Sequence, residues 1–377
     1  MSGAVKIKGW CPGALRPMMS GDGLIVRIRP PAGRLDQRQT AGIAALADRF
    51  GNGIIDLSNR ANVQLRGIAK NRYEALIDGL RSLGLIDPDR VVESRRNILV
   101  TPFRSADDAS GVIAAQLSSM LARPDAPDVS AKFGYAVDLG AKPVLQDAPG
   151  DVRLERAADG TLLLCAAGYF LGKPVSHDTA VPQMLSLARW SLEHGTRMSR
   201  ILDKGTPLPD GFDIARQSVA SVPEPGIYPA GVLVATAFGQ LDAATLSDIA
   251  GLGALRVTPW RMLLIEGATS LPRRASLICS PADPMLRVMA CIGAPGCTQG
   301  HAGTRDLARD LAKHVPVGQT LHVSGCAKGC AFPRAANFTM TATSAGFDLI
   351  RDGTADATPE HTGLSARDLP DFLKKVH

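Results

Sequence analysis

An internal repeat is the feature that most restricts how this chain can fold. Residues 23–36 show an alternating strand pattern, then a turn, and end in Leu-Asp before a helical pattern; residues 231–242 repeat this order. Asp36 and Asp242 stand where each would cap the helix that follows. We therefore expect two similar halves, each containing strands and helices.

Further elements recur in the same order in both halves. Helices are predicted at residues 37–50 and 243–250, and β-branched, apolar runs predict strands at residues 53–57, 63–67, 254–257 and 262–266. Each half then has a strand that runs into an Asp-Gly turn, at residues 151–164 and 346–354, and a helix after it, at residues 180–194 and 365–376. This recurrence indicates a duplicated chain.

At 377 residues the chain is longer than a single hydrophobic core usually supports. Pro- and Gly-rich segments at residues 205–212 and 222–226 separate the two halves, which span about 1–205 and 225–377. Hydrophobic residues make up 45% and charged residues 21%, as is typical of globular proteins. Several packed domains are therefore expected.

Charge and hydropathy bear on the class of partner. The net charge is +6 and the pI is about 9.0, which suits a polyanionic ligand. Basic residues stand mostly alone, without the runs or aromatic motifs of nucleic-acid binders, so no nucleic acid is expected. No apolar run reaches the roughly 18–20 residues of a membrane span, and the N-terminus lacks the apolar stretch of a secretory signal. A cytoplasmic protein without a membrane partner is expected.

Four of the seven cysteines fall in two closely spaced pairs. Cys291 and Cys297 form Cys-x5-Cys, and Cys326 and Cys330 form Cys-x3-Cys, each inside a glycine-rich segment. Four thiolates are the ligand set of a 4Fe–4S cluster, and glycines allow the backbone to wrap closely around it. We predict that these four cysteines bind one cluster.

Other uses of these thiols fit the spacing less well. A structural zinc ion prefers Cys-x2–4-Cys, which only the second pair provides, and disulfides are rare in the cytoplasm. A zinc-stabilised, non-catalytic module that binds a tetrapyrrole or nucleic acid stays open as an alternative. Cys11, Cys165 and Cys279 stand alone, and of these only Cys11, in a Cys-Pro-Gly loop, is a candidate for a site.

The cysteine pattern, with Ser-Gly before Cys326, resembles that of the nitrite/sulfite reductase superfamily. Residues 57–67 resemble the family's Thr-Arg-x-x-x-Gln-x-x-Gly stretch, residues 95–99 its Arg-Asn-Ile segment, and residues 131–134 its Arg-Lys-Phe-Lys segment. The resemblance covers nearly the whole chain. It implies a duplicated α+β fold, with ferredoxin-like half-domains at 1–90 and 222–268 and α/β domains at 91–205 and 269–377, in a pseudo-twofold arrangement.

The same resemblance implies roles for the residues in these segments. In the reductases the cysteines hold a 4Fe–4S cluster beside siroheme, and the last of them, which corresponds to Cys330, bridges the two groups. Basic residues surround the tetrapyrrole and bind the anionic substrate. The resemblance therefore implies substrate-binding roles for Arg60, Asn62, Gln64 and Arg66, and catalytic roles for Arg96 and Lys132.

Departures from the reductase pattern point to one branch of the superfamily. Gly134 replaces the second lysine of Lys-Phe-Lys, and Ala327-Lys328 replaces the usual Pro-Asn between the last two cysteines. Residues 9–24, 255–261 and 324–333 resemble instead the precorrin-3B synthases of aerobic cobalamin biosynthesis. This implies an O2-dependent monooxygenase that hydroxylates C20 of precorrin-3A as a γ-lactone forms. A siroheme-dependent sulfite or nitrite reductase is the alternative.

Partners and further cofactors follow from the same resemblance. A reduced tetrapyrrole with several carboxylates suits a cleft lined with arginines. The synthases imply a further non-haem iron, but no compact His/Asp/Glu spacing supplies its ligands here. His301 and His322 lie nearest the cysteines and are interpreted as structural. No Gly-x-Gly-x-x-Gly follows a predicted strand, so an external reductase is expected to donate the electrons.

Overall fold

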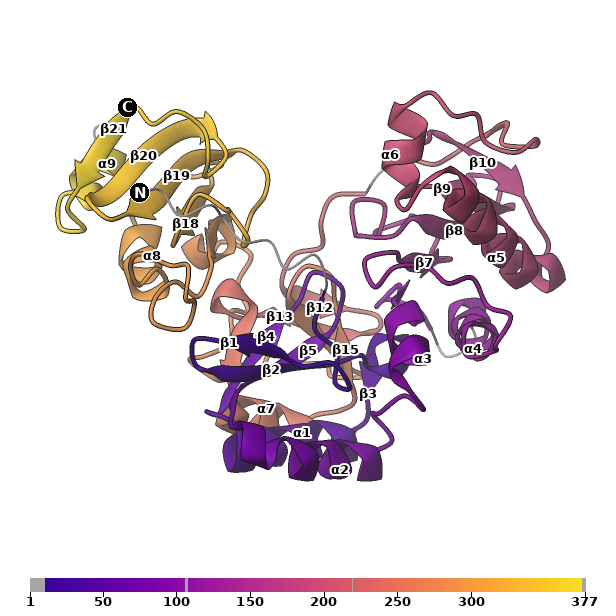
Figure 1. Cartoon of the computed structure of the whole chain (residues 1–377), viewed down its shortest axis with the longest axis horizontal. Coiled ribbons are helices and arrows are strands. Elements are labelled where there is room, and N and C mark those ends of the chain that lie inside the picture. Colours follow the sequence, from indigo (N-terminus) through magenta and orange to yellow (C-terminus); the bar gives the residue numbers. More distant parts are fainter. Residues whose placement is uncertain (1–10, 106–107, 219, 375–377) are drawn as a thin grey trace.

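The structure is a computed structural model, and it describes residues 11–105, 108–218 and 220–374. Four β-sheets form a central body with a lobe on either side of it (Figure 1). Gly9 and Trp10 of the synthase-like segment, and the end predicted for the last helix, lie outside the described residues. The two halves of the sequence meet in the central body.

Each of the two central sheets takes its last strand from the other half of the chain. The first sheet has the order β1 (Met18–Ser20), β2 (Gly23–Ile28), β5 (Val63–Ile68), β4 (Ile54–Leu57) and β14 (Gln240–Asp242). The second has the order β12 (Gly226–Tyr228), β13 (Gly231–Ala235), β16 (Met262–Glu266), β15 (Leu255–Val257) and β3 (Arg34–Leu35). Leu241 of β14 lies opposite Ile55, and Leu35 of β3 lies opposite Leu255. Neither sheet therefore lies wholly within one of the predicted domain ranges.

Helices cover one face of the central sheets. They are α1 (Gln37–Phe50), α2 (Tyr73–Ser82) and α7 (Ala243–Ala250), and α1 packs against α7 (Figure 1). The backbone N–H of Gln39 donates to the Asp36 carboxylate at 2.7 Å, and that of Thr245 donates to the Asp242 carboxylate at 2.6 Å. Both predicted caps and both predicted helices are confirmed.

The first lobe contains a six-stranded sheet and most of the remaining helices. The strand order is β11 (Ile214–Ala215), β10 (Leu171–Pro174), β9 (Leu162–Ala166), β8 (Val152–Arg156), β7 (Tyr135–Asp138) and β6 (Ile98–Val100). The helices of this part of the chain are α3 (Arg90–Arg95), α4 (Ala109–Leu121), α5 (His177–His194) and α6 (Met198–Asp203). The predicted hairpin is confirmed as β8 and β9, with Gly160 at φ +88° in its turn.

The second lobe has a five-stranded sheet in the order β17 (Val288–Ala290), β18 (Leu321–Ser324), β19 (Ala336–Thr343), β20 (Gly346–Gly353) and β21 (His361–Leu364). Its helices are α8 (Arg305–Ala312) and α9 (Leu369–Lys374). The Asp-Gly turn predicted in this segment is wrong. β19 is long enough to pair with the whole segment, and Ala336 lies opposite Gly353, so β20 continues through Asp352 and Gly353.

The duplication extends to unusual backbone conformations. Ala32 and Phe238 hold equivalent positions before β3 and β14, with φ of 49° and 61°. Ala61 and Arg261 hold equivalent positions in the β4–β5 and β15–β16 turns, with φ of 52° and 62°. Residues other than glycine rarely adopt this left-handed backbone conformation, which costs about 1–3 kcal/mol per residue. Its recurrence at matching positions confirms the repeat. In the described part of the chain, no helix is both long and apolar enough to cross a bilayer.

Candidate functional site

The four paired cysteines line one cleft of about 550 Å³. Cys291 directly follows β17, and Cys326 follows β18 after a single glycine. β17 and β18 are parallel, with Ala290 opposite Val323, so both segments leave the sheet at the same edge. The backbone N–H of Gly325 donates to Cys291 Sγ at 3.1 Å. The fold therefore brings together the two pairs that the sequence singled out.

Glycines let the two cysteine segments approach each other closely. Gly293 has φ +61°, and a β-carbon built there would lie 2.5 Å from the carbonyl oxygen of Ala302. A β-carbon built on Gly325 would lie 3.0 Å from Gly293 Cα and 3.4 Å from Cys291 Sγ. Any larger residue would displace the opposite segment or the thiol. Gly293 and Gly325 thus form a glycine cradle, in which the two segments can approach closely because neither residue has a side chain.

The four cysteines of the cleft match the ligand set of a 4Fe–4S cluster in number and kind. Among the described residues, no three His, Cys, Asp or Glu side chains are gathered tightly enough to share a single ion. In a cubane cluster each cysteine binds a different iron, so four thiolates are needed. Burial raises the pKa of the Cys330 thiol; Lys328 opposes this, and the other three cysteines reinforce it. The four residues fit a 4Fe–4S cluster.

A fully buried histidine lies beneath the second cysteine segment. His322 Cε1 is 3.7 Å from the position of a β-carbon built on Gly329. Within the described residues, neither ring nitrogen has a hydrogen-bond partner. Burial lowers the pKa of His322 to about 4, so the ring is neutral and carries one N–H. Buried polar groups are usually hydrogen-bonded, so His322 is an exception within the described residues.

The opposite wall of the cleft comes from the first half of the chain. Arg27 of β2 lies opposite Gln64 of β5, and its Nε and Nη2 donate to Gln64 Oε1 at 3.0 and 2.7 Å. Burial lowers the pKa of Arg27 to about 10, still well above neutral pH. Lys132 lines the same cleft. Two of the predicted residues, Gln64 and Lys132, therefore lie on the wall that faces the cysteines.

The cleft carries an excess of positive charge. Its basic lining residues are Arg27, Arg66, Lys132, Arg261, Arg305 and Lys328, and its one carboxylate is Asp56. Arg66 and Arg305 are ion-paired with Asp56. In the part of the chain that the structure describes, the other four form no ion pair with a carboxylate. These four cations leave the cleft suited to a ligand with several carboxylates.

Not all predicted residues reach this cleft. Arg60 lies just behind it, where its Nη2 donates to the carbonyl oxygen of Lys132 at 2.7 Å. Asn62 and Arg96 line a separate cavity of about 230 Å³. Arg96 is held there by a two-point ion pair with Asp87, at 2.6 and 2.8 Å. The structure thus brings Gln64, Arg66 and Lys132 to the cysteines but not Asn62 or Arg96.

Comparison with known proteins agrees with this geometry. The sequence profile of the nitrite/sulfite reductase ferredoxin-like half domain matches residues 16–83. The structure of the NirA protein of Mycobacterium tuberculosis is similar with a TM-score of 0.63 and 19% identity, covering 94% of this chain and 80% of that one. The chain has the duplicated nitrite/sulfite reductase fold.

Relatives by sequence include precorrin-3B synthases and nitrite reductases. A precorrin-3B synthase of Sinorhizobium sp. is 29% identical over 405 residues, covering 93% of this chain and 84% of that protein. A ferredoxin–nitrite reductase of Synechococcus elongatus is 23% identical, covering 96% of this chain and 86% of that protein. The resemblance to precorrin-3B synthases within the nitrite/sulfite reductase superfamily, predicted from the motifs, is confirmed.

Sequence reasoning missed three arginines of this nitrite/sulfite reductase fold. Arg27 is the cross-strand neighbour of Gln64, and the strand pairing was needed to find it. Arg261 occupies the repeat position of Ala61, and the one signal for it was the synthase-like segment 255–261, which ends at this residue. Arg305 comes from α8, and its place in the cleft depends on how the second lobe docks.

Proposed function

We propose that this chain is an oxidoreductase of the precorrin-3B synthase type, which acts on a reduced tetrapyrrole bearing several carboxylates. The observation that carries the proposal is that one cleft is lined by four cysteines and by four cations that pair with no carboxylate among the described residues. The similarity to a precorrin-3B synthase over 93% of the chain supports this chemistry within the superfamily. The proposed reaction is the O2-dependent hydroxylation of C20 of precorrin-3A with formation of a γ-lactone.

In this proposal Cys291, Cys297, Cys326 and Cys330 hold a 4Fe–4S cluster. The bound cluster would supply one-electron transfer at the edge of the substrate cleft. The glycine cradle brings backbone N–H groups towards the thiolates, as the contact from Gly325 to Cys291 Sγ illustrates. An external reductase is the proposed source of electrons. We propose no ligand set for a further non-haem iron.

The remaining lining residues bind and orient the substrate. Arg27, Lys132 and Arg261 would each donate to a substrate carboxylate, and each charge-assisted contact would contribute about 1.5–3 kcal/mol. Gln64 orients the Arg27 guanidinium, and Arg60 supports Lys132 through its backbone carbonyl. Several such contacts at once would present one carbon of the ring for attack. The catalytic role of Arg96 and the substrate contact of Asn62 stay predictions.

Gly134 supports the synthase over the reductase. A β-carbon built on Gly134 would lie 3.0 Å from the carbonyl oxygen of Pro149 and 3.4 Å from Arg60 Nη1. The lysine that reductases carry here would therefore require its neighbours to shift. With glycine at this position the chain lacks one of the cations and proton donors on which reduction of sulfite or nitrite would draw.

The direct test is turnover. Protein isolated without oxygen is incubated with precorrin-3A, a chemical or enzymatic electron donor and O2. The proposal expects consumption of the tetrapyrrole with matching O2 uptake and incorporation of one oxygen atom from 18O2. A cluster-loaded protein that leaves the tetrapyrrole unchanged under these conditions contradicts it.

A siroheme-dependent reductase is the second candidate, supported by the similarity to a ferredoxin–nitrite reductase over 96% of the chain. The absorption spectrum separates the two. Siroheme gives intense Soret and red bands, whereas a thiolate-bound iron–sulfur cluster gives a broad shoulder at about 400 nm. Stoichiometric siroheme together with reduction of nitrite or sulfite would replace the leading proposal with this one.

A further inference from the structure

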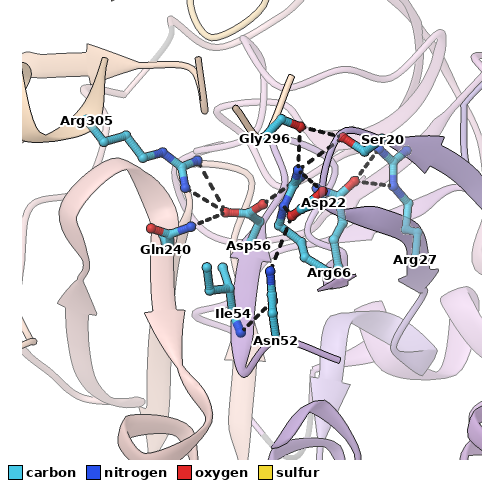
Figure 2. Close-up of polar contacts among 11 residues, drawn as sticks. Ser20, Asp22, Arg27, Asn52, Ile54, Asp56, Arg66, Gln240, Gly296 and Arg305 are labelled. Carbon is cyan, nitrogen blue, oxygen red and sulfur yellow. Dashed lines mark hydrogen bonds and ion pairs between the residues drawn. The ribbon is translucent and has the colours of Figure 1, made fainter. Parts of the chain in front are cut away.

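The carbonyl oxygen of Gly296, beside Cys297, receives donors from the other half of the molecule. Ser20 Oγ donates to it at 2.8 Å and the backbone N–H of Gly21 at 3.2 Å, and Arg66 Nη2 approaches it at 3.5 Å. All three donors come from the first half, whereas Gly296 belongs to the segment between β17 and α8 (Figure 2). The cysteine segment is therefore held from across the cleft.

Arg66 is itself fixed in place. Its Nε and Nη2 donate to the Asp22 carboxylate at 2.9 and 3.0 Å, and its Nη1 donates to Asp56 at 3.3 Å (Figure 2). Asp56 also accepts, at 3.3 Å, from Gln240 of β14 and Arg305 of α8 in the second half. Breaking a buried group of paired charges is costly because it leaves the remaining charges unpaired. The network therefore resists movement of the Arg66 guanidinium.

The turn between β1 and β2 also fits closely against the cysteine segment. A β-carbon built on Gly21 would lie 2.3 Å from the carbonyl oxygen of Pro295. On its own side, the backbone N–H of Cys297 donates to the carbonyl oxygen of Gly293 at 2.7 Å. The position of Cys297 thus depends on a bond within its own segment and on contacts with the first half.

We infer that Ser20, Gly21 and Arg66 form a clamp on Gly296 that positions Cys297, so that the first half of the chain completes the cluster site. The inference rests on the proposed cluster. A ligand residue whose backbone is already ordered loses less conformational freedom when it binds. Ser20 and Arg66 also line the cleft, so a tetrapyrrole bound there would contact the residues that hold Cys297.

The test measures how fast the cluster is lost. The added methyl group of Gly21→Ala would clash with the carbonyl oxygen of Pro295, and Ser20→Ala removes the shortest contact to Gly296. Reduced, cluster-loaded proteins are exposed to a ferrous-iron chelator without oxygen, and iron release is followed by absorbance. We expect release about 10-fold faster in Ser20→Ala, the effect of losing a hydrogen bond worth about 1.4 kcal/mol. We also expect faster release in Gly21→Ala, because the added methyl group displaces the segment that positions Cys297. Ser20→Thr, which keeps the hydroxyl, is expected to release iron at the wild-type rate.

Matched controls come from positions far from the cleft. A β-carbon on Gly111 meets no heavy atom within 4 Å, and the Ser94 hydroxyl is exposed and donates only to its own helix. Gly111→Ala and Ser94→Ala should release iron at the wild-type rate. Wild-type release rates in both Gly21→Ala and Ser20→Ala would overturn the inferred clamp but would not contradict the proposed cluster. A wild-type protein that never holds an iron–sulfur cluster would instead overturn the proposed function.

Discussion

Lys132 carries a charge that the described part of the chain does not neutralise with any carboxylate. If it binds a substrate carboxylate, Lys132→Met should lower kcat/KM by roughly 10- to 100-fold, the loss of one charge-assisted contact. The melting temperature should stay unchanged. Lys142→Met, at an exposed position outside the cleft, is the control. Equal kinetics in the two variants would mean that the tetrapyrrole binds elsewhere.

The raised pKa of Asp138 should make the free energy of unfolding depend on pH. Burial raises the pKa of Asp138 to about 6, although the N–H groups of Leu145 and Val144 oppose the shift. The folded chain then keeps a proton that the unfolded chain loses above about pH 4. This contribution to stability is complete below about pH 4 and is lost as pH rises through about 6.

Asp138→Asn cannot titrate and should remove this dependence. Urea unfolding of wild type and variant at pH 4.5 and pH 7 should show the wild type losing about 2 kcal/mol more than the variant as pH rises. A difference between the two proteins that is the same at both pH values would contradict the assignment.

Which side chains reach the site could be predicted only in part. The four cysteines were found because their spacing and glycines are local properties of the sequence. Asn62 and Arg96 lie in similarly basic segments, yet in the folded chain they line a second cavity. Arg96 pairs with Asp87, nine residues before it, and no local pattern indicated that this pair would face away from the cysteines.

At the scale of elements, the exchanged strands join the two halves. β3 has two residues and β14 has three, and each pairs with a strand about 200 positions away. Such short segments carry no strand pattern of their own, so the sequence could not predict the exchange. The helices that follow them were predictable because Asp36 and Asp242 cap them through local contacts.

The exchanged strands should contribute strongly to stability. Leu35 and Leu241 are 1% and 4% exposed in the shared core. Leu35→Ala and Leu241→Ala should each lower the free energy of unfolding by about 2–4 kcal/mol, the usual cost of deleting a buried leucine side chain. Val317→Ala, at a residue that is 91% exposed, is the control and should change it by less than about 0.5 kcal/mol. If the leucine variants unfold like this control, the exchanged strands do not tie the halves together.

At the scale of the whole molecule, duplication produces two related halves with different surfaces. Ala32 and Ala61 line the small cavity of the first half, whereas their counterparts Phe238 and Arg261 line the cysteine cleft. The repeat was predictable from sequence order, but the position of the cleft was not, because it lies where one lobe meets the central body of the other half.

The charge of this cleft predicts a ligand affinity that depends on salt. Binding of a metal-free porphyrin octacarboxylate, followed by fluorescence, should weaken by about 10-fold or more between 0.05 and 0.5 M salt because the facing charges are screened. Neutralising Arg27 together with Lys132 should flatten this dependence. Binding that is equally tight at both salt concentrations would show that carboxylate pairing does not hold the ligand.

We propose that Cys291, Cys297, Cys326 and Cys330 share one cluster at the edge of a basic cleft. Iron and acid-labile sulfide, measured per chain in protein isolated without oxygen, test it most directly. We predict about four of each in the wild type and loss of both in Cys326→Ser. A wild type that carries one zinc ion, or no iron after reconstitution with iron and sulfide, would contradict the account.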